Sequence, residues 1–121
     1  MGLFNFFKKD KQDDAQPQER HWLLRTNDGE VIEPTWDEIE SAVTNAKSEQ
    51  SVFATLAYVN AGLEIDSVQT LGDDSGYRFE ALSQDGDIYV NDGLSHEETL
   101  KYFEEFFNTE KVVGYRSWMK E

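Results

Sequence analysis

The sequence VFATLAYV at residues 52–59 decides the fold. Five of these eight residues are β-branched or aromatic, the types that fit the pleated, half-buried surface of a sheet. Asn60-Ala61-Gly62 follows directly and is typical of a turn that ends a strand. We therefore predict that residues 52–59 form a central strand.

Two strands are predicted before this one. Residues 21–26 form a short apolar run that ends at Asn27-Asp28-Gly29, a sequence typical of hairpin turns. A second short strand is expected at residues 30–33. Together they predict a hairpin at the beginning of the domain.

Three more strands are predicted after the central one. Apolar residues separated by polar ones over 63–71 indicate a half-exposed strand with a possible bulge, and the composition of 72–76 predicts a loop. Residues 77–82 and 87–90 favour two further strands, and Asn91-Asp92-Gly93 is expected to close the last one. These strands would form an antiparallel meander.

Two helix starts carry the same capping signal. Thr35 and Ser95 can each cap a helix, and each has a glutamate three residues further on, at the capping-box position. Apolar side chains then recur at helical spacing to about residue 47 and about residue 108, with Trp36 and Tyr77 expected in the core. We expect an α+β fold, an antiparallel sheet of about four to six strands with two helices packed on it.

The 121 residues suffice for one domain. Residues 8–20 are almost entirely polar or charged, a composition that does not offset the entropy lost on ordering. We expect a flexible leader and linker at 1–20 and a single α+β domain at 21–121.

The beginning of the leader is amphipathic. Met1–Lys9 places Leu3, Phe4 and Phe7 on one helical face, with Lys8 and Lys9 beyond it. Three roles are open for this segment: it packs back onto the domain, it stays flexible, or it touches a membrane surface. It is much shorter than an export signal or a membrane span.

Charge indicates the class of partner. The net charge is −14, and residues 1–20 hold equal numbers of acidic and basic side chains, so the domain carries the whole excess. Such a domain repels nucleic acid and anionic membranes and attracts a basic protein, although solubility alone is the alternative explanation. The chain has no cysteine, which suits a reducing cytoplasm. The oligomeric state stays open.

No motif for catalysis, cofactor binding or metal binding is found in the sequence. The two histidines, His21 and His96, lack metal-ligand spacing, and phosphate-binding and nucleophile motifs are missing. We expect no catalytic residue, no cofactor and no metal site. A hydrolase using paired carboxylates from Glu64, Asp66 and Glu80 is the alternative, and it requires a pocket that holds at least two of them.

Acidic loops are the predicted partner-facing surface. Turn preferences of Asp and Gly explain these loops better than a calcium site, because EF-hand ligand spacing is missing. The residues that we expect to face a basic partner are Asp73, Asp74, Asp85, Asp87 and Asp92. The sequence thus predicts a non-catalytic binding protein, with a general interaction or regulatory module as the alternative.

The order of landmarks resembles a known family. The landmarks are Pro34-Thr35-Trp36 with Ile39, a strand containing Gln69, the strand Tyr77-Arg78-Phe79-Glu80, a Phe-rich helix at 102–107, and Trp118. In this order they resemble small immunity proteins of bacterial polymorphic toxin systems, over roughly residues 21–118. The resemblance implies an α+β domain that blocks a cognate toxin, often a nuclease or deaminase. The leader at 1–20 lies outside the pattern. The stretch at residues 51–71 is longer than the family pattern leads one to expect.

Overall fold

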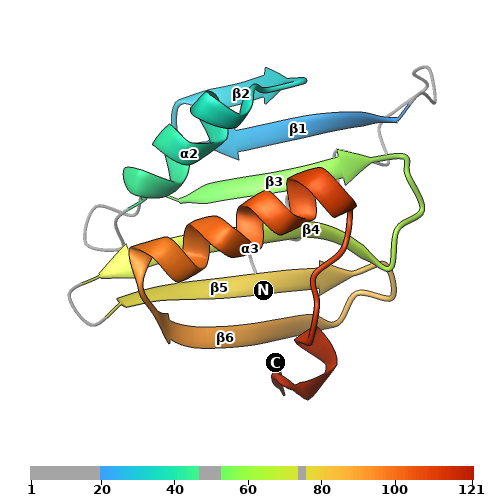
Figure 1. Ribbon diagram of the computed structural model, residues 1–121. Helices are drawn as coiled ribbons and strands as arrows, with labels where there is room; N and C mark the ends of the chain where they lie inside the picture. The colour runs from blue at the N-terminus through green and yellow to red at the C-terminus, as the bar shows by residue number, and fades with distance from the viewer. Residues whose placement is uncertain (1–19, 47–52, 74–75) are drawn as a thin grey trace.

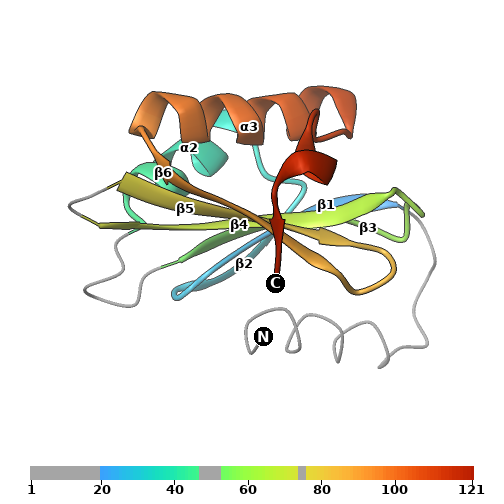
Figure 2. The same ribbon diagram turned by 90° about the horizontal axis from the view of Figure 1, so that it is seen from below.

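The computed structural model describes residues 20–46, 53–73 and 76–121. These residues form one antiparallel sheet of seven strands, with two α-helices on the same face of the sheet (Figures 1 and 2). The strands are β1 (His21–Thr26), β2 (Gly29–Ile32), β3 (Ala54–Val59), β4 (Ile65–Asp73), β5 (Gly76–Ser83), β6 (Ile88–Leu94) and β7 (Met119–Lys120). The predicted leader lies outside the described residues, except for Arg20.

Strand order is β2-β1-β3-β4-β5-β6-β7. The β1–β2 hairpin forms one edge, and the chain then crosses one face as α2 (Trp36–Thr44) to place β3 against β1. The predicted α+β architecture is confirmed. The sheet exceeds the expected four to six strands because the C-terminal Met119–Lys120 pairs with β6, and the Glu121 N–H donates to the Ile88 carbonyl at 2.8 Å.

Both helices begin at the predicted capping boxes. The Glu38 N–H donates to Thr35 Oγ1 at 3.2 Å, and the Glu98 N–H donates to Ser95 Oγ at 3.0 Å. The second helix, α3 (His96–Thr109), closely follows the expected range, whereas α2 ends at Thr44, before the expected residue 47. Local signals therefore define the starts better than the ends.

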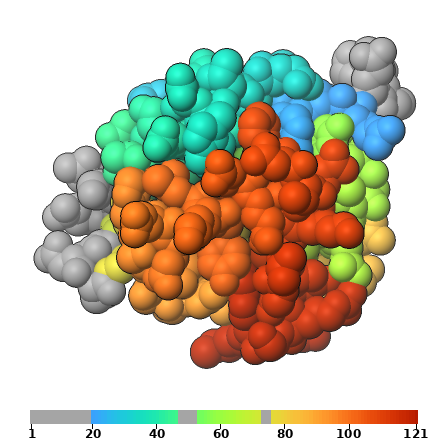
Figure 3. All heavy atoms as spheres, viewed as in Figure 1, coloured from blue at the N-terminus to red at the C-terminus, as the bar shows by residue number. Residues whose placement is uncertain are grey.

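The core lies between the helices and one face of the sheet. Phe79 and Leu56 on the sheet and Ile39, Phe103 and Phe106 on the helices are fully buried. The helices also contact each other, through the stacked rings of Trp36 and Phe107 and through Thr44 Oγ1, 2.9 Å from His96 Nε2. Viewed from the side of the two helices, the atoms of α2 and α3 lie in front of much of the sheet (Figure 3). Of the predicted core residues, Tyr77 is buried and Trp36 half-buried.

Three expectations for β4 to β6 were wrong. Strand β4 is largely buried and not half-exposed, because Ile65 and Val68 belong to the core under the helices and Gln69 is buried on the opposite face. It also extends through Gly72, which was expected in a loop. Glycine fits this position of the strand because the Tyr77 ring packs against it, and a Cβ on residue 72 would lie 2.7 Å from that ring. Strand β6 continues through Asn91-Asp92-Gly93, because the register of β5 and β6 shifts between Tyr77 and Phe79 and absorbs the turn sequence.

Candidate functional site

Strand β2 is an open edge of the sheet. It stands at one end of the strand order, and within the described residues it pairs only with β1. All four of its residues are exposed, including the apolar Ile32 at 65%. An edge of this kind offers unpaired N–H and C=O groups to another chain.

The backbone groups that point outward from β2 can be identified. The Glu33 N–H donates to the Trp22 carbonyl at 2.8 Å, so Glu33 faces β1. In an antiparallel ladder, residues bonded to one neighbour alternate with residues that point away from it. Val31 therefore faces β1, whereas the backbone groups of Glu30 and Ile32 point outward. A strand added at this edge would bond to Glu30 and Ile32.

A groove lies between this hairpin and α2. It has a volume of about 530 Å³. Its apolar lining comes from Leu24, Val31, Ala42 and Phe53, and its acidic lining from Asp28, Asp37 and Glu38, which are all exposed. Among the described residues that line it, none is a Lys or an Arg. The groove thus presents negative charge and apolar surface directly beside the open strand.

The local structure explains the position of these acids. Asp28 lies in the turn of the β1–β2 hairpin, where its N–H donates to Thr26 Oγ1 at 3.1 Å. Asp37 and Glu38 are in the first turn of α2, where negative charge is favourable near the positive end of the helix dipole. Glu38 also accepts a hydrogen bond from the Thr35 N–H at 2.8 Å, which leaves Asp37 the freer carboxylate for a ligand.

A polar row crosses the opposite face of the sheet. Register places Glu30, Arg25, Thr55, Gln69 and Glu80 side by side on β2, β1, β3, β4 and β5. Glu30 and Arg25 form an ion pair. Thr55 Oγ1 donates to Gln69 Oε1 at 3.0 Å, and Gln69 Nε2 donates to Glu80 Oε1 at 3.2 Å. All but Glu30 are buried.

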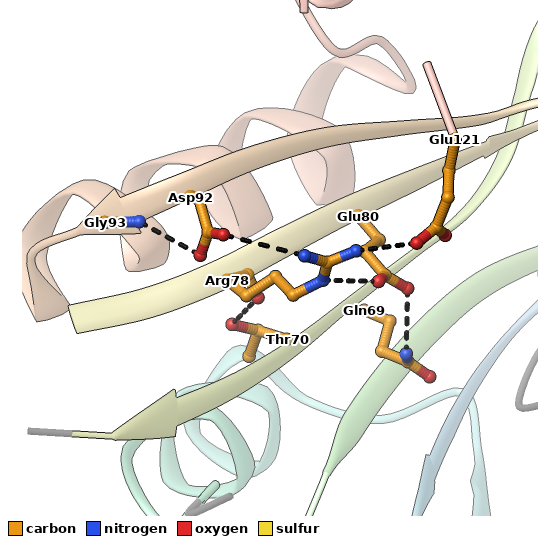
Figure 4. A network of polar contacts seen from close by, with 7 residues as sticks. All are labelled: Gln69, Thr70, Arg78, Glu80, Asp92, Gly93 and Glu121. Carbon is orange, nitrogen blue, oxygen red and sulfur yellow. Dashed lines mark hydrogen bonds and ion pairs between the residues drawn. The ribbon is translucent and has the colours of Figure 1, made fainter. Parts of the chain in front are cut away.

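Arg78 joins this row to the C-terminus (Figure 4). Its Nε donates to Glu80 Oε2 at 2.8 Å and its Nη2 to Glu121 Oε2 at 2.9 Å, while Nη1 lies 3.6 Å from Asp92 Oδ2. The hydrogen bond to Glu80 is the main cause that raises the pKa of Arg78. Both carboxylate oxygens of Glu80 therefore accept hydrogen bonds from neighbouring side chains, which favours a structural role for this network over proton transfer.

The structure separates the predicted acidic loop residues. Asp73 and Asp92 lie toward the end of the sheet where β4 joins β5, and Asp85 and Asp87 lie at the other end, between β5 and β6 (Figure 1). Asp85 and Asp92 are exposed, and Asp87 lies 3.7 Å from Lys120 Nζ. Asp74 and the side chain of Asp73 lie outside the described residues. Asp85 and Asp87 therefore do not share one surface with Asp92.

Two of the three acids of the hydrolase alternative, Glu64 and Glu80, lie in different surroundings, and the third, Asp66, is half-buried near the start of β4. Glu64 forms an exposed ion pair with Arg116, whereas Glu80 is buried in the network around Arg78. Within the described residues, no group of three or more His, Cys, Asp or Glu side chains could hold a metal ion. In the same part of the chain, no helix is long and apolar enough to cross a membrane.

Sequence reasoning missed the groove. The sequence predicts a capping box that includes Glu38 and a turn that includes Asp28, and both predictions are correct locally. The signal that was present is their position on both sides of a short strand with exposed apolar residues. Comparisons with family models, curated proteins and solved structures gave no match.

Proposed function

We propose that this protein is a non-catalytic binding protein that takes an extended, basic segment of a partner protein as an additional strand on β2. The observation that carries the proposal is the open β2 edge lying beside a groove whose charged lining residues, within the described part of the chain, are all acidic. Strand addition combines main-chain hydrogen bonds, which provide affinity, with side-chain contacts, which provide specificity.

The groove supports both parts of such recognition. The backbone of Glu30 and Ile32 would pair with the incoming strand, and alternate side chains of that strand would point toward the groove. There an apolar side chain would meet Val31 and Phe53, and a lysine or arginine would meet Asp28 or Asp37. The net charge of −14 adds long-range attraction for a basic partner, and salt weakens this attraction.

A substitution at Ile32 separates backbone pairing from side-chain contact. Proline lacks an N–H, and Ile32→Pro removes the outward donor while the β1–β2 ladder keeps its bonds through Val31. Ile32→Ala is the matched control, because it removes the side chain and keeps the N–H. The probe is an end-blocked peptide of alternating lysine and valine, with a glutamate–valine peptide as the charge control.

The expected result is binding of the lysine–valine peptide to the wild type and to Ile32→Ala, and no binding to Ile32→Pro. Titration followed by NMR should place the largest amide shifts at Glu30, Ile32 and Asp37. Equal binding of the glutamate–valine peptide, or equal affinity of Ile32→Pro and Ile32→Ala, would contradict the proposal.

The carboxylates of the groove allow a second test. Asp28→Asn with Asp37→Asn should weaken peptide binding and reduce its dependence on salt concentration, since one or two ion pairs are lost. Glu104→Gln, at an exposed position on α3 away from the groove, removes the same kind of charge and should leave binding nearly unchanged.

The resemblance to immunity proteins suggests a finer proposal for the partner, namely a basic toxin that processes nucleic acid. An acidic inhibitor associates rapidly with such an enzyme and blocks its substrate channel. Co-expression with a toxin encoded beside this protein should protect the cell, and Ile32→Pro should remove the protection. Protection that survives Ile32→Pro would indicate a different surface.

A further inference from the structure

The face of the sheet that bears the polar row also holds a second apolar cluster. Its members are Leu23, Ala57, Leu82, Ile88 and Val90, and Val59 packs against them. Both described helices lie on the other face (Figure 2). A sheet face left in water is normally polar, so an apolar cluster here calls for a cover.

The cluster is buried. Ala57 and Leu82 are each 4% exposed, although the described helices pack on the opposite side of their strands. The cluster crosses most of the sheet, because Leu23 lies beside Ala57 and Leu82 beside Ile88, with Ser67 between the two pairs. It spans four strand spacings, about 19 Å.

The chain outside the described residues supplies one segment suited to this cluster. Residues 47–52 and 74–75 connect elements at the opposite end of the strands, because Ala54 pairs with Thr26 and Asp73 with Gly76. The leader instead joins β1 at His21, which lies opposite Val59 at the margin of the cluster. We infer that Leu3, Phe4 and Phe7 of the leader dock on this cluster as an intramolecular cover.

Length and charge both fit this occupant. A helix over residues 1–9 would be about 13 Å long, and residues 10–19 can span at most about 36 Å, which is enough to cross the sheet from His21. Lys8, Lys9 and Lys11 would then lie against a domain that carries the whole net charge of −14. With this face covered, the β2 edge is left as the surface for a partner.

The absence of cysteine permits a direct test on the full chain. Asn5→Cys carries a nitroxide spin label on the helical face opposite Phe4 and Phe7, so the label does not replace a docking side chain. The expected result is a loss of NMR peak intensity at the amides of Ala57, Leu82 and Ile88, with the amides of α3 unaffected. Loss at α3, or no loss at the cluster, would overturn the inference.

Variants within the leader supply the control. Phe4→Ser with Phe7→Ser in the labelled chain should restore the intensities at the cluster, whereas Gln12→Ser with Gln16→Ser should not. The leader lies outside the elements that form the domain core, so these variants leave the domain folded, and unchanged α3 shifts would verify this. Restoration by both pairs, or by neither, would contradict docking through the aromatic face.

Two other occupants give distinct outcomes. In a mixed sample, one chain carries the nitroxide but no ¹⁵N, and the other carries ¹⁵N but no nitroxide. If the cluster amides of the ¹⁵N chain are broadened in this mixture, a second copy supplies the cover and the inference fails. If the labelled Asn5→Cys chain floats with vesicles of phosphatidylcholine and phosphatidylglycerol and shows no intramolecular broadening without them, a membrane is the occupant and the inference also fails. Ile32→Pro should not change the broadening, so this test is independent of the proposed function.

Discussion

Gln69→Leu replaces one side chain by another of similar size, but we expect it to destabilise the domain strongly. Gln69 is 3% exposed and connects Thr55 to Glu80. Leucine has nearly the same size but leaves the Thr55 hydroxyl and one carboxylate oxygen of Glu80 without these partners. An unsatisfied neutral group costs about 1 kcal/mol and a lost bond to a charged group about 1.5–3 kcal/mol. We expect the free energy of unfolding to fall by about 2.5–4 kcal/mol.

Urea denaturation followed by circular dichroism measures this loss through the linear dependence of the free energy on urea. The same loss corresponds to a decrease in Tm of about 10–30 °C for a domain of this size. Gln84→Leu is the matched control, because Gln84 is exposed in the turn after β5, and it should change stability by no more than about 0.5 kcal/mol. Similar losses from the two variants would refute the structural role of the network.

Two more predictions concern the helix start and the response to alkali. Ser95→Ala removes the hydroxyl that accepts the Glu98 N–H and should lower the free energy of unfolding by about 1 kcal/mol, whereas Glu97→Gln beside it should have a smaller effect; equal effects in urea denaturation would argue against the capping box. Burial, assisted by a hydrogen bond with Glu64, raises the pKa of Tyr115 above its ordinary value of 10.0, so the folded state keeps this proton where the unfolded chain loses it. Stability should therefore fall as the pH rises above 10.0 and through the raised pKa, and Tyr115→Phe should make this fall shallower; an unchanged slope would contradict the assignment.

The sequence predicted those parts of the fold that depend on neighbouring residues. Both capping boxes and the β1–β2 turn are local patterns, and all three were predicted correctly. Strand β7 and the continuation of β6 were missed because they depend on contacts between distant residues. Met119 pairs with Val90, and the register shift between Tyr77 and Phe79 on the neighbouring strand lets the turn sequence at Asn91 stay in β6.

The candidate site was harder to predict for the same reason. Asp28 and Asp37 belong to different elements, and they line one groove only because α2 folds back beside the β1–β2 hairpin. The acidic loops were chosen by composition, and antiparallel connectivity placed them at opposite ends of the sheet. Gln69 was an informative residue of the polar row, because a buried polar side chain in a strand is expected to form hydrogen bonds with polar side chains on the neighbouring strands.

The two edges of the sheet differ: a short strand pairs with β6 at one edge, whereas β2 is the outermost described strand at the other. This difference favours a binding role for β2. The β6 edge is paired with β7, a strand of only two residues, and Glu121 adds a further backbone bond to Ile88. Short edge strands of this kind limit association with other chains. At the other edge, no strand of the described residues pairs with the outward backbone of Glu30 and Ile32, which lies beside a groove with an acidic lining. If avoiding aggregation alone shaped this fold, a lysine or proline would be expected on β2, where the chain has the exposed Val31 and Ile32.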